Sequence, residues 1–176
     1  MRIQGLSADN WATWHAQILH IETQVYEPSR RDTIDTLESI IFNSQGVSLV
    51  AIENERVAGF CLGAPLEHFS RIRGPAEDSS LNSRTTIYAA DTCVSPSNQG
   101  KGIGRALKIQ QLARAREQGY QRVTGRNRAL YADAMWRLNR SLGARAVHII
   151  EGDYHDGLTP DICIYYMIDL TQESMS

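Results

Sequence analysis

Three glycines at alternate positions form the clearest chemical signal in this sequence, within the stretch VSPSNQGKGIGRA at residues 94–106. They are Gly100, Gly102 and Gly104. Each glycine costs roughly 0.5–1 kcal/mol relative to alanine inside regular structure, so three together need a reason. A glycine turn lets backbone N–H groups converge on an anion, and the dipole of a following helix adds to that attraction. With Lys101 and Arg105 beside it, the turn predicts a pyrophosphate site.

Three common nucleotide-binding motifs do not fit this stretch. A P-loop, G-x-x-x-x-G-K-[ST], needs Ser or Thr after its lysine, whereas Gly102 follows Lys101. The dinucleotide motif G-x-G-x-x-G matches at Gly100 and Gly102 but meets Arg105 at its third position. The glycine loop of protein kinases fails at that same residue. The turn therefore belongs to another class of phosphate site.

Residues 94–104 resemble the signature of the GNAT superfamily, the acetyl-CoA-dependent N-acetyltransferases. That signature, V-x-P-x-x-[QR]-[GR]-x-G-[IL]-[GA], lies between a strand and a helix, and the chain matches each defined position. The resemblance implies acetyl-CoA as cosubstrate, with its pantetheine arm in a gap between two splayed strands. It also implies an oxyanion donor in the backbone N–H of Cys93 or Val94. The coenzyme-binding residues that it implies here are Thr92, Cys93, Val94, Gln99, Gly100, Lys101, Gly102, Ile103, Gly104 and Arg105.

A second GNAT-like motif, N-x-x-[AM]-x-x-[LI]-[YN]-x-x-[LG]-G-[FA], covers residues 132–144. Two positions depart from the family. The leading Asn is Ala132, although Asn127 lies upstream and can take a similar part, and the frequent catalytic Tyr is Asn139. The resemblance thus implies Asn127, Trp136 and Asn139 as further coenzyme contacts. It also puts Asn139 at a catalytic position where it has no proton to give.

Acetyl transfer to an amine requires a base, because only about one alkylamine in a thousand is neutral at pH 7. Asp91 is the predicted base. Its carboxylate lies in the apolar run YAADTCV, where burial costs several kcal/mol unless the group is paired or its pKa is raised. The alternative is a structural aspartate that backbone or arginine donors satisfy.

Other polar residues give weaker signals. Tyr131 is the nearest candidate for the acid that protonates the leaving thiolate, with Tyr165 and Tyr166 as further candidates and packing as the alternative role for all three. Glu22 and Glu27 either hold a cationic substrate or are solvated. Cys93 has no nearby histidine, which favours direct transfer over an acyl-cysteine intermediate. No metal is expected, since the nearest set of ligand types falls across a strand end: His148, Glu151, Asp153 and His155.

These residues must be positioned by alternating helices and strands. Residues 2–6 predict a strand, 10–26 and 33–42 helices, and 46–65 a hairpin that turns at 53–55. A polar loop, residues 66–84, leads to a strand at 85–94 and to the helix that ends at Gly119. A strand at 120–126, a helix at 129–143 and two final strands, 144–152 and 162–170, complete the chain.

Apolar spacing also predicts which helix faces are buried. The helix after the glycines is expected to bury Ala106, Ile109, Leu112 and Ala113. The helix at 129–143 is expected to bury Leu130, Ala134, Leu138 and Leu142. The expected fold is α/β: one domain over residues 1–176, with a mixed, mostly antiparallel sheet of six to seven strands and helices on both faces.

Composition limits the partners. The net charge of −2 provides no positive electrostatic field that would attract nucleic acid. No apolar run approaches the ~20 residues of a membrane span. The N-terminus lacks the apolar region of a signal peptide, and the three cysteines lie among apolar neighbours as reduced strand residues. A cytoplasmic protein is expected. A homodimer is an expectation from the family alone.

The sequence therefore predicts an N-acetyltransferase that moves an acetyl group from acetyl-CoA to a primary amine by direct attack in a ternary complex. One mixture of polar and charged residues suits an acceptor that carries both signs of charge, such as an amino acid. Its members are Glu22, Tyr26, Glu27, Arg30, Arg31 and Asp32. Two alternatives remain open: a non-catalytic acetyl-CoA-binding module, and an acyltransferase for a longer acyl-CoA.

Overall fold

The structure is a computed structural model that describes residues 1–171. Its helices are α1 (Ala8–Val25), α2 (Ile34–Ile41), α3 (Ile103–Glu117) and α4 (Asp133–Ser141). Its strands are β1 (Arg2–Gly5), β2 (Leu49–Glu53), β3 (Arg56–Pro65), β4 (Thr86–Val94), β5 (Arg122–Arg128), β6 (Arg145–Glu151) and β7 (Ile162–Asp169). Single 3₁₀ turns, η1 to η4, span Pro28–Arg30, Leu66–Phe69, Pro75–Glu77 and Pro96–Asn98.

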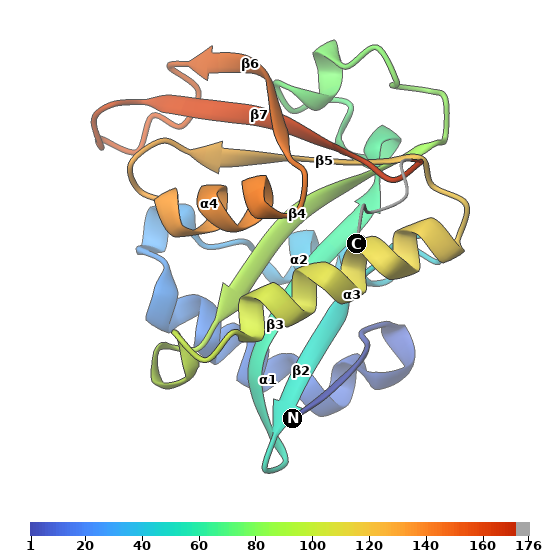
Figure 1. The fold of residues 1–176 in the computed structure, drawn as a ribbon. Coiled ribbons are helices and arrows are strands. Elements are labelled where there is room, and N and C mark those ends of the chain that lie inside the picture. Colours follow the sequence, from blue (N-terminus) through green and yellow to red (C-terminus); the bar gives the residue numbers. More distant parts are fainter. Residues whose placement is uncertain (172–176) are drawn as a thin grey trace. The chain divides into compact units, whose positions relative to one another are not determined.

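The strands form a mixed seven-stranded sheet in the order β1-β2-β3-β4-β5-β7-β6 (Figure 1). Strands β4 and β5 are parallel, whereas β1 with β2, β2 with β3, β5 with β7 and β6 with β7 are antiparallel. The predicted mixed, mostly antiparallel sheet is therefore confirmed. The β4–β5 ladder runs from the pair Thr86–Arg122 to the pair Ala89–Gly125, while β4 itself continues to Val94.

The chain divides into two compact units, which are described separately. The first comprises Met1–Ala64 and Ala90–Arg114, and the second comprises Pro65–Ala89 and the chain from Ala115 onward. The expectation of a single domain stays a prediction. Within residues 1–171 no helix combines the length and the apolar character that a bilayer span requires.

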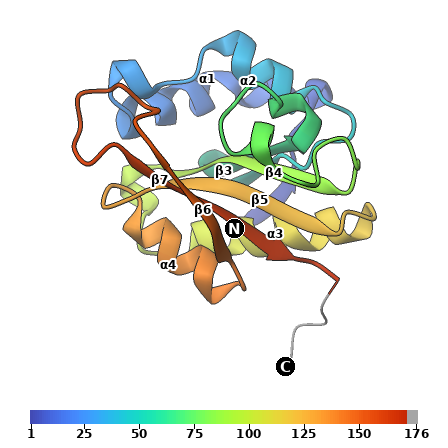
Figure 2. The same ribbon diagram turned by 90° about the horizontal axis from the view of Figure 1, so that it is seen from above.

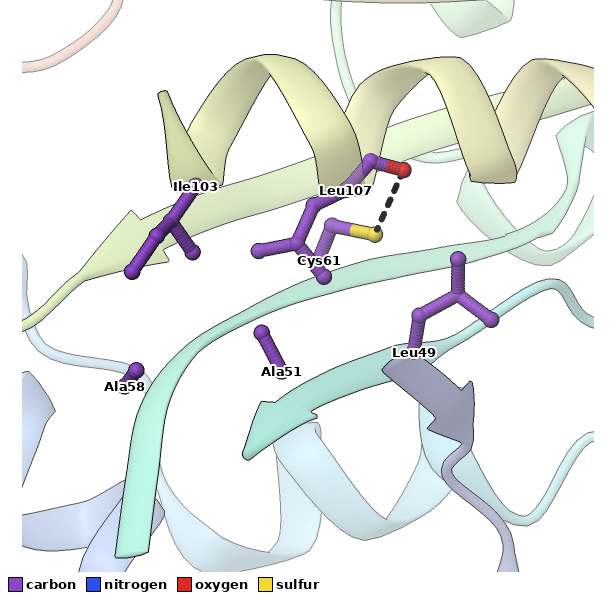
Figure 3. Close-up of a cluster of buried hydrophobic side chains, with 6 residues drawn as sticks. All are labelled: Leu49, Ala51, Ala58, Cys61, Ile103 and Leu107. Atoms are coloured by element: carbon purple, nitrogen blue, oxygen red, sulfur yellow. Dashed lines mark hydrogen bonds between the residues drawn. The ribbon is translucent and has the colours of Figure 1, made fainter. Parts of the chain in front are cut away.

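In the first unit, α1 and α2 lie over one face of the strands and α3 lies over the other (Figure 2). Beneath α3, a buried apolar cluster joins the helix to β2 and β3 (Figure 3). Its members are Leu49, Ala51, Ala58, Cys61, Ile103 and Leu107. The thiol of Cys61 donates to the Leu107 carbonyl over 3.9 Å. This packing fixes the start of α3, and with it the turn that precedes the helix.

Local signals explain the elements of this unit. Ser7 is the N-cap of α1 and its N–H donates to Asn10 Oδ1, while Thr33 caps α2 by accepting from the Thr36 N–H. Asn54 and Glu55 form the β2–β3 turn with φ of 50° and 59°. Positive φ at both central residues suits the right-handed twist of a two-residue hairpin. The predicted hairpin is confirmed.

Close packing of β3 on β4 leaves no room for a side chain at Gly59. A Cβ added there would lie 2.8 Å from the Cys93 carbonyl oxygen and 3.3 Å from Val94 Cα, both of which are backbone atoms. Gly59→Ala is expected to lower the free energy of unfolding by roughly 1–3 kcal/mol, because the strand must shift. Urea unfolding measures this. Gly104→Ala is the control: its Cβ would meet Val94 Cγ2 at an ordinary 3.6 Å, so a comparable loss there would refute the steric explanation.

In the second unit, α4 covers one face of β5 and β7, and the segment that contains η2 and η3 covers the other (Figure 2). Trp136 of α4 packs on Tyr166 with ring centroids 6.1 Å apart. On the opposite face, the Tyr165 hydroxyl donates to Asp78 Oδ2 over 2.6 Å. The predicted loop at 66–84 thus contains two short 3₁₀ turns, and the half-buried Asp78 joins it to β7 by a hydrogen bond.

Two predicted helix faces are wrong. On α3, Ile109 is 46% exposed, and the buried positions include Lys108 and Gln111. The Gln111 amide reaches the Val47 carbonyl and accepts from Lys108 Nζ, so polar side chains occupy the inner face.

On the next helix, Leu130 is 67% exposed at φ 67°, Ala134 is exposed, and the helix begins only at Asp133. Strand β5 instead continues to Arg128, and Asn139 is the buried residue of α4. The helix starts four residues later than predicted, so Leu130 lies outside it, and its buried position is Asn139 rather than Ala134.

Candidate active site

The turn between β4 and α3 contains two glycines in the left-handed conformation. Gly100 has φ of 77° and Gly102 has φ of 79°. A Cβ added at either glycine would meet no atom within 4 Å, so the space beside this turn is open. The first N–H groups of α3 have no acceptor within the helix, as at any helix start. An open turn of this kind, ending at a helix N-terminus, fits an anion such as a pyrophosphate.

The third glycine, Gly104, differs from the other two. It lies in the first turn of α3, has no positive φ, and would tolerate a Cβ. Backbone conformation therefore requires glycine at two of the three positions. A close approach of a ligand remains the predicted reason for the third.

Side chains of the same loop brace the turn. Gln99 Nε2 donates to the Val94 carbonyl over 3.2 Å, and Asn98 Nδ2 donates to Ser95 Oγ over 2.8 Å. Lys101 Nζ donates to Asn98 Oδ1 over 2.9 Å at the surface. These contacts position the loop, and the roles of Gln99 and Lys101 toward a coenzyme stay predictions.

Asp91 lies in β4, three residues before the strand ends. Its Oδ1 accepts from the Tyr26 hydroxyl and from the Thr92 N–H, each over 2.7 Å. Burial raises the pKa of Asp91 above its usual range, although the donors Tyr26, Glu22 and Thr92 and the positive charge of Lys108 oppose that shift. A carboxylate with a raised pKa and a fixed orientation suits a general base.

Glu22 is a site residue whose role the sequence did not reveal. It lies on the inner face of α1, is 2% exposed, and interacts directly with the Asp91 carboxyl group. Burial raises the pKa of Glu22 to about 8, and repulsion from Asp91 adds to this. The spacing Trp11, Trp14, Ile18 could have indicated it, because Glu22 continues that buried stripe at the next i+4 position.

Cys93 is buried beside this carboxyl group. Burial raises the pKa of its thiol, and the negative charge of Asp91 raises it further. A thiol held in its protonated form is a poor nucleophile, which is consistent with direct transfer rather than an acyl-cysteine.

In the second unit, the structure brings Asn127 of β5 and Asn139 of α4 together. Asn139 Nδ2 donates to Asn127 Oδ1 over 2.9 Å, and both residues are buried. Asn139 Oδ1 is buried and accepts no hydrogen bond from the described residues. The two asparagines therefore form one polar unit that fixes α4 against β5.

Of the three tyrosines considered as acids, two are committed to packing. Tyr165 is buried with its hydroxyl on Asp78, and Tyr166 is buried against Trp136. Tyr131 is 45% exposed, with its hydroxyl donating to the Thr159 carbonyl over 2.8 Å. Tyr131 is thus the accessible one of the three.

The four metal-type side chains near β6 have other contacts or directions. Asp153 Oδ2 pairs with Arg126 at 2.7 Å, and His148 Nε2 lies 3.5 Å from Glu77 Oε2. In residues 1–171 no group of three or more His, Cys, Asp or Glu side chains is arranged to hold a metal ion.

Comparison with protein families gives one match across most of the chain. The model described as Acetyltransferase (GNAT) family matches residues 10–139. This range includes the glycine turn, Asp91, Glu22 and Asn139. Comparison with curated proteins gives no significant sequence match.

Solved structures with the same fold include three acetyltransferase-related proteins. The ribosomal-protein-S18-alanine N-acetyltransferase from Escherichia coli has a TM-score of 0.74 at 17% identity, over 99% of this chain and 97% of that one. YncA from Salmonella typhimurium, a putative acetyltransferase with its cofactor acetyl-CoA, has a TM-score of 0.70 at 19% identity, over 100% and 97%.

The loading GNATL domain of CurA from Lyngbya majuscula has a TM-score of 0.76 at 13% identity, over 98% of each chain. At these identities the likeness establishes the fold alone.

Proposed function

Because the chain belongs to the GNAT acetyltransferase family, we propose that it transfers an acetyl group from acetyl-CoA to a primary amine. The acceptor is a small molecule such as an amino acid, and the transfer is direct, in a ternary complex. The observation that carries this proposal is the open turn at the start of α3, where two left-handed glycines border empty space. An open turn at a helix N-terminus suits an anion, and the linked phosphates of a coenzyme are such a ligand.

The coenzyme would be held mainly through backbone groups. The turn from Gln99 to Arg105 would bind the pyrophosphate, with Lys101 and Arg105 adding positive charge. The main chain from Thr92 to Val94, beyond the β4–β5 ladder, would pair with the amides of the pantetheine arm. Asn127, Trp136 and Asn139 are the contacts proposed from the second motif.

The chemical step needs a neutral amine. Asp91 would take a proton from the ammonium form of the acceptor, and its raised pKa brings its basicity closer to the pKa of the amine. The free lone pair would then attack the thioester carbonyl. A backbone N–H at Cys93 or Val94 would donate to the oxyanion, and positioning of both substrates would supply much of the remaining rate.

The coenzyme thiolate either is protonated by an acid as it leaves or departs unprotonated. Asn139 occupies the position where the family often has a tyrosine and cannot protonate the thiolate. Tyr131 is the accessible tyrosine, and its hydroxyl would have to leave the Thr159 carbonyl to act. A coenzyme thiolate is a good leaving group because its pKa lies near that of cysteine, about 8.5.

A panel of small amines with acetyl-CoA tests the proposal, with the appearance of the coenzyme thiol as readout. We expect turnover with at least one amino acid or similar zwitterion, and none without an amine. Tight acetyl-CoA binding without turnover on any amine would support a non-catalytic binding module instead. A larger thermal shift with longer acyl-CoAs than with acetyl-CoA would reassign the acyl donor.

A further inference from the structure

The Glu22 and Asp91 carboxyl groups face each other without enough donors. Among residues 1–171, both oxygens of Glu22 and Oδ2 of Asp91 are buried and receive no hydrogen bond of normal distance and angle. The backbone N–H of Asp32 lies near enough to Glu22 to oppose the rise of its pKa. The two carboxyl groups nevertheless interact directly. Two carboxylates cannot hydrogen-bond to each other unless one carries a proton, because an ionised carboxylate only accepts. A proton on one member of the pair would let the two groups form that hydrogen bond.

The charged and titratable groups around the pair favour a single proton. The pair meets Tyr26 at the C-terminal cap of α1, Asp32 in the following loop, Cys93 in β4 and the buried Lys108 in α3. Lys108 favours one anion at this site, whereas Asp32 opposes a second. Asp91 receives two further donors, Tyr26 and Thr92, so it is the member that carries the charge.

We propose that Glu22 and Asp91 share one proton, resting on Glu22, and that this pair acts as the base through the Tyr26 hydroxyl. Asp91 Oδ2 is buried, so an acceptor amine cannot reach it. Oδ1 is covered by the Tyr26 hydroxyl at 2.7 Å, and Tyr26 is only half-buried. The route from the amine to the carboxylate therefore passes through Tyr26.

This inference rests on the proposed function for the identity of the proton donor. The ammonium N–H bond breaks as its proton passes to Tyr26 Oη, while the hydroxyl proton of Tyr26 passes to Asp91 Oδ1. One proton moves in all: the amine becomes neutral, Asp91 becomes a neutral acid, and Tyr26 is unchanged. Glu22 is a positioning residue, whose proton holds Asp91 as the anion until that transfer.

Protein stability tests the shared proton without any substrate. The pKa of Glu22 is about 8 in the folded protein, against an ordinary value of 4.5. Between those values the folded state holds a proton that the unfolded state has lost, so stability falls as pH rises through this window. The linked unfolding equilibrium constant increases about tenfold per pH unit.

The experiment compares urea unfolding of the wild type, Glu22→Gln and Glu27→Gln from pH 5 to pH 8. We expect the wild type and Glu27→Gln, which alters an exposed carboxylate of the adjoining segment, to lose stability with rising pH. Glu22→Gln keeps a hydrogen-bond donor toward Asp91 but cannot titrate. Its unfolding equilibrium constant should therefore rise with pH less steeply than that of the wild type, by up to about tenfold per pH unit. Equal slopes in all three proteins would overturn the shared proton.

Carbon NMR of the wild type, labelled at the glutamate carboxyl groups, covers the case in which the variant does not fold. One glutamate resonance should titrate near pH 8. If all of them titrate at ordinary pH values for glutamate, the shared proton is refuted.

The route through Tyr26 is tested with Tyr26→Phe, which removes only the hydroxyl group. We expect kcat for an amine to fall at least tenfold while the Kd for acetyl-CoA is unchanged; an unchanged kcat would overturn the relay. An amine panel without any turnover refutes the proposed function, while the unfolding and NMR results still decide whether the proton is shared.

Discussion

We expect Asp91→Asn to lower kcat by roughly 10²–10⁴-fold and to leave acetyl-CoA binding intact. That factor is the usual contribution of a general base. Asparagine keeps the shape of the side chain and can still accept from Tyr26 and Thr92. It has no basicity, so the acceptor ammonium keeps its proton. Initial rates at saturating acetyl-CoA, with the best amine from the panel, measure the effect.

The pH profile separates this role from a structural one. In the wild type, kcat/KM should fall as pH decreases through the raised pKa of the carboxyl pair, because protonated Asp91 cannot accept a second proton. In Asp91→Asn that limb should disappear. Asp35→Asn, an exposed carboxylate on α2, is the control and should match the wild type. A kcat for Asp91→Asn that equals the wild-type value at each pH would remove Asp91 from catalysis.

Alanine at Gly100 or Gly102 is expected to raise the Kd for acetyl-CoA at least tenfold. An L-residue at φ of 77° or 79° costs roughly 1–2 kcal/mol, and relaxing that strain turns the N–H groups away from the phosphates. The added methyl group also occupies the open space beside the turn. Calorimetric titration with acetyl-CoA measures the loss of affinity.

Gly119→Ala provides a matched control for this change. Gly119 has φ of 88° and lies just after the C-terminal end of α3. A Cβ added at Gly119 would meet no atom within 4 Å. Its alanine variant carries the same kind of backbone strain and should lose similar stability. Its affinity for acetyl-CoA should stay at the wild-type value. If Gly119→Ala lowered the affinity for acetyl-CoA as much as alanine at Gly100 or Gly102, general destabilisation rather than phosphate binding would explain the result.

The sequence predicted the parts of this protein that depend on local backbone chemistry. Gly100 and Gly102 were recognisable because a turn that needs positive φ before a helix favours glycine at those positions. Asp91 was recognisable because a carboxylate within an apolar strand contradicts its surroundings. The hairpin turn at Asn54 and Glu55 follows the same local logic.

The parts that depend on packing between distant segments were not predictable. Glu22 was expected either to hold substrate or to be solvated, since nothing in α1 shows that β4 places a second carboxyl group against it. The burial of Lys108 and Gln111 was not predicted, because it depends on the Val47 carbonyl, 64 residues away from Gln111. Asn139 became buried for a similar reason, through Asn127. In each case a polar partner outweighed the apolar periodicity.

The three cysteines have a practical consequence for experiments on this protein. All three are buried and none forms a disulfide. Burial raises the pKa of Cys61 to about 12, and that of Cys93 is also raised, so neither carries much thiolate near neutral pH. A chromogenic thiol reagent added to the folded enzyme should therefore report the released coenzyme with little background. A slow additional signal, approaching three equivalents per chain, would instead report unfolding of the enzyme during the assay.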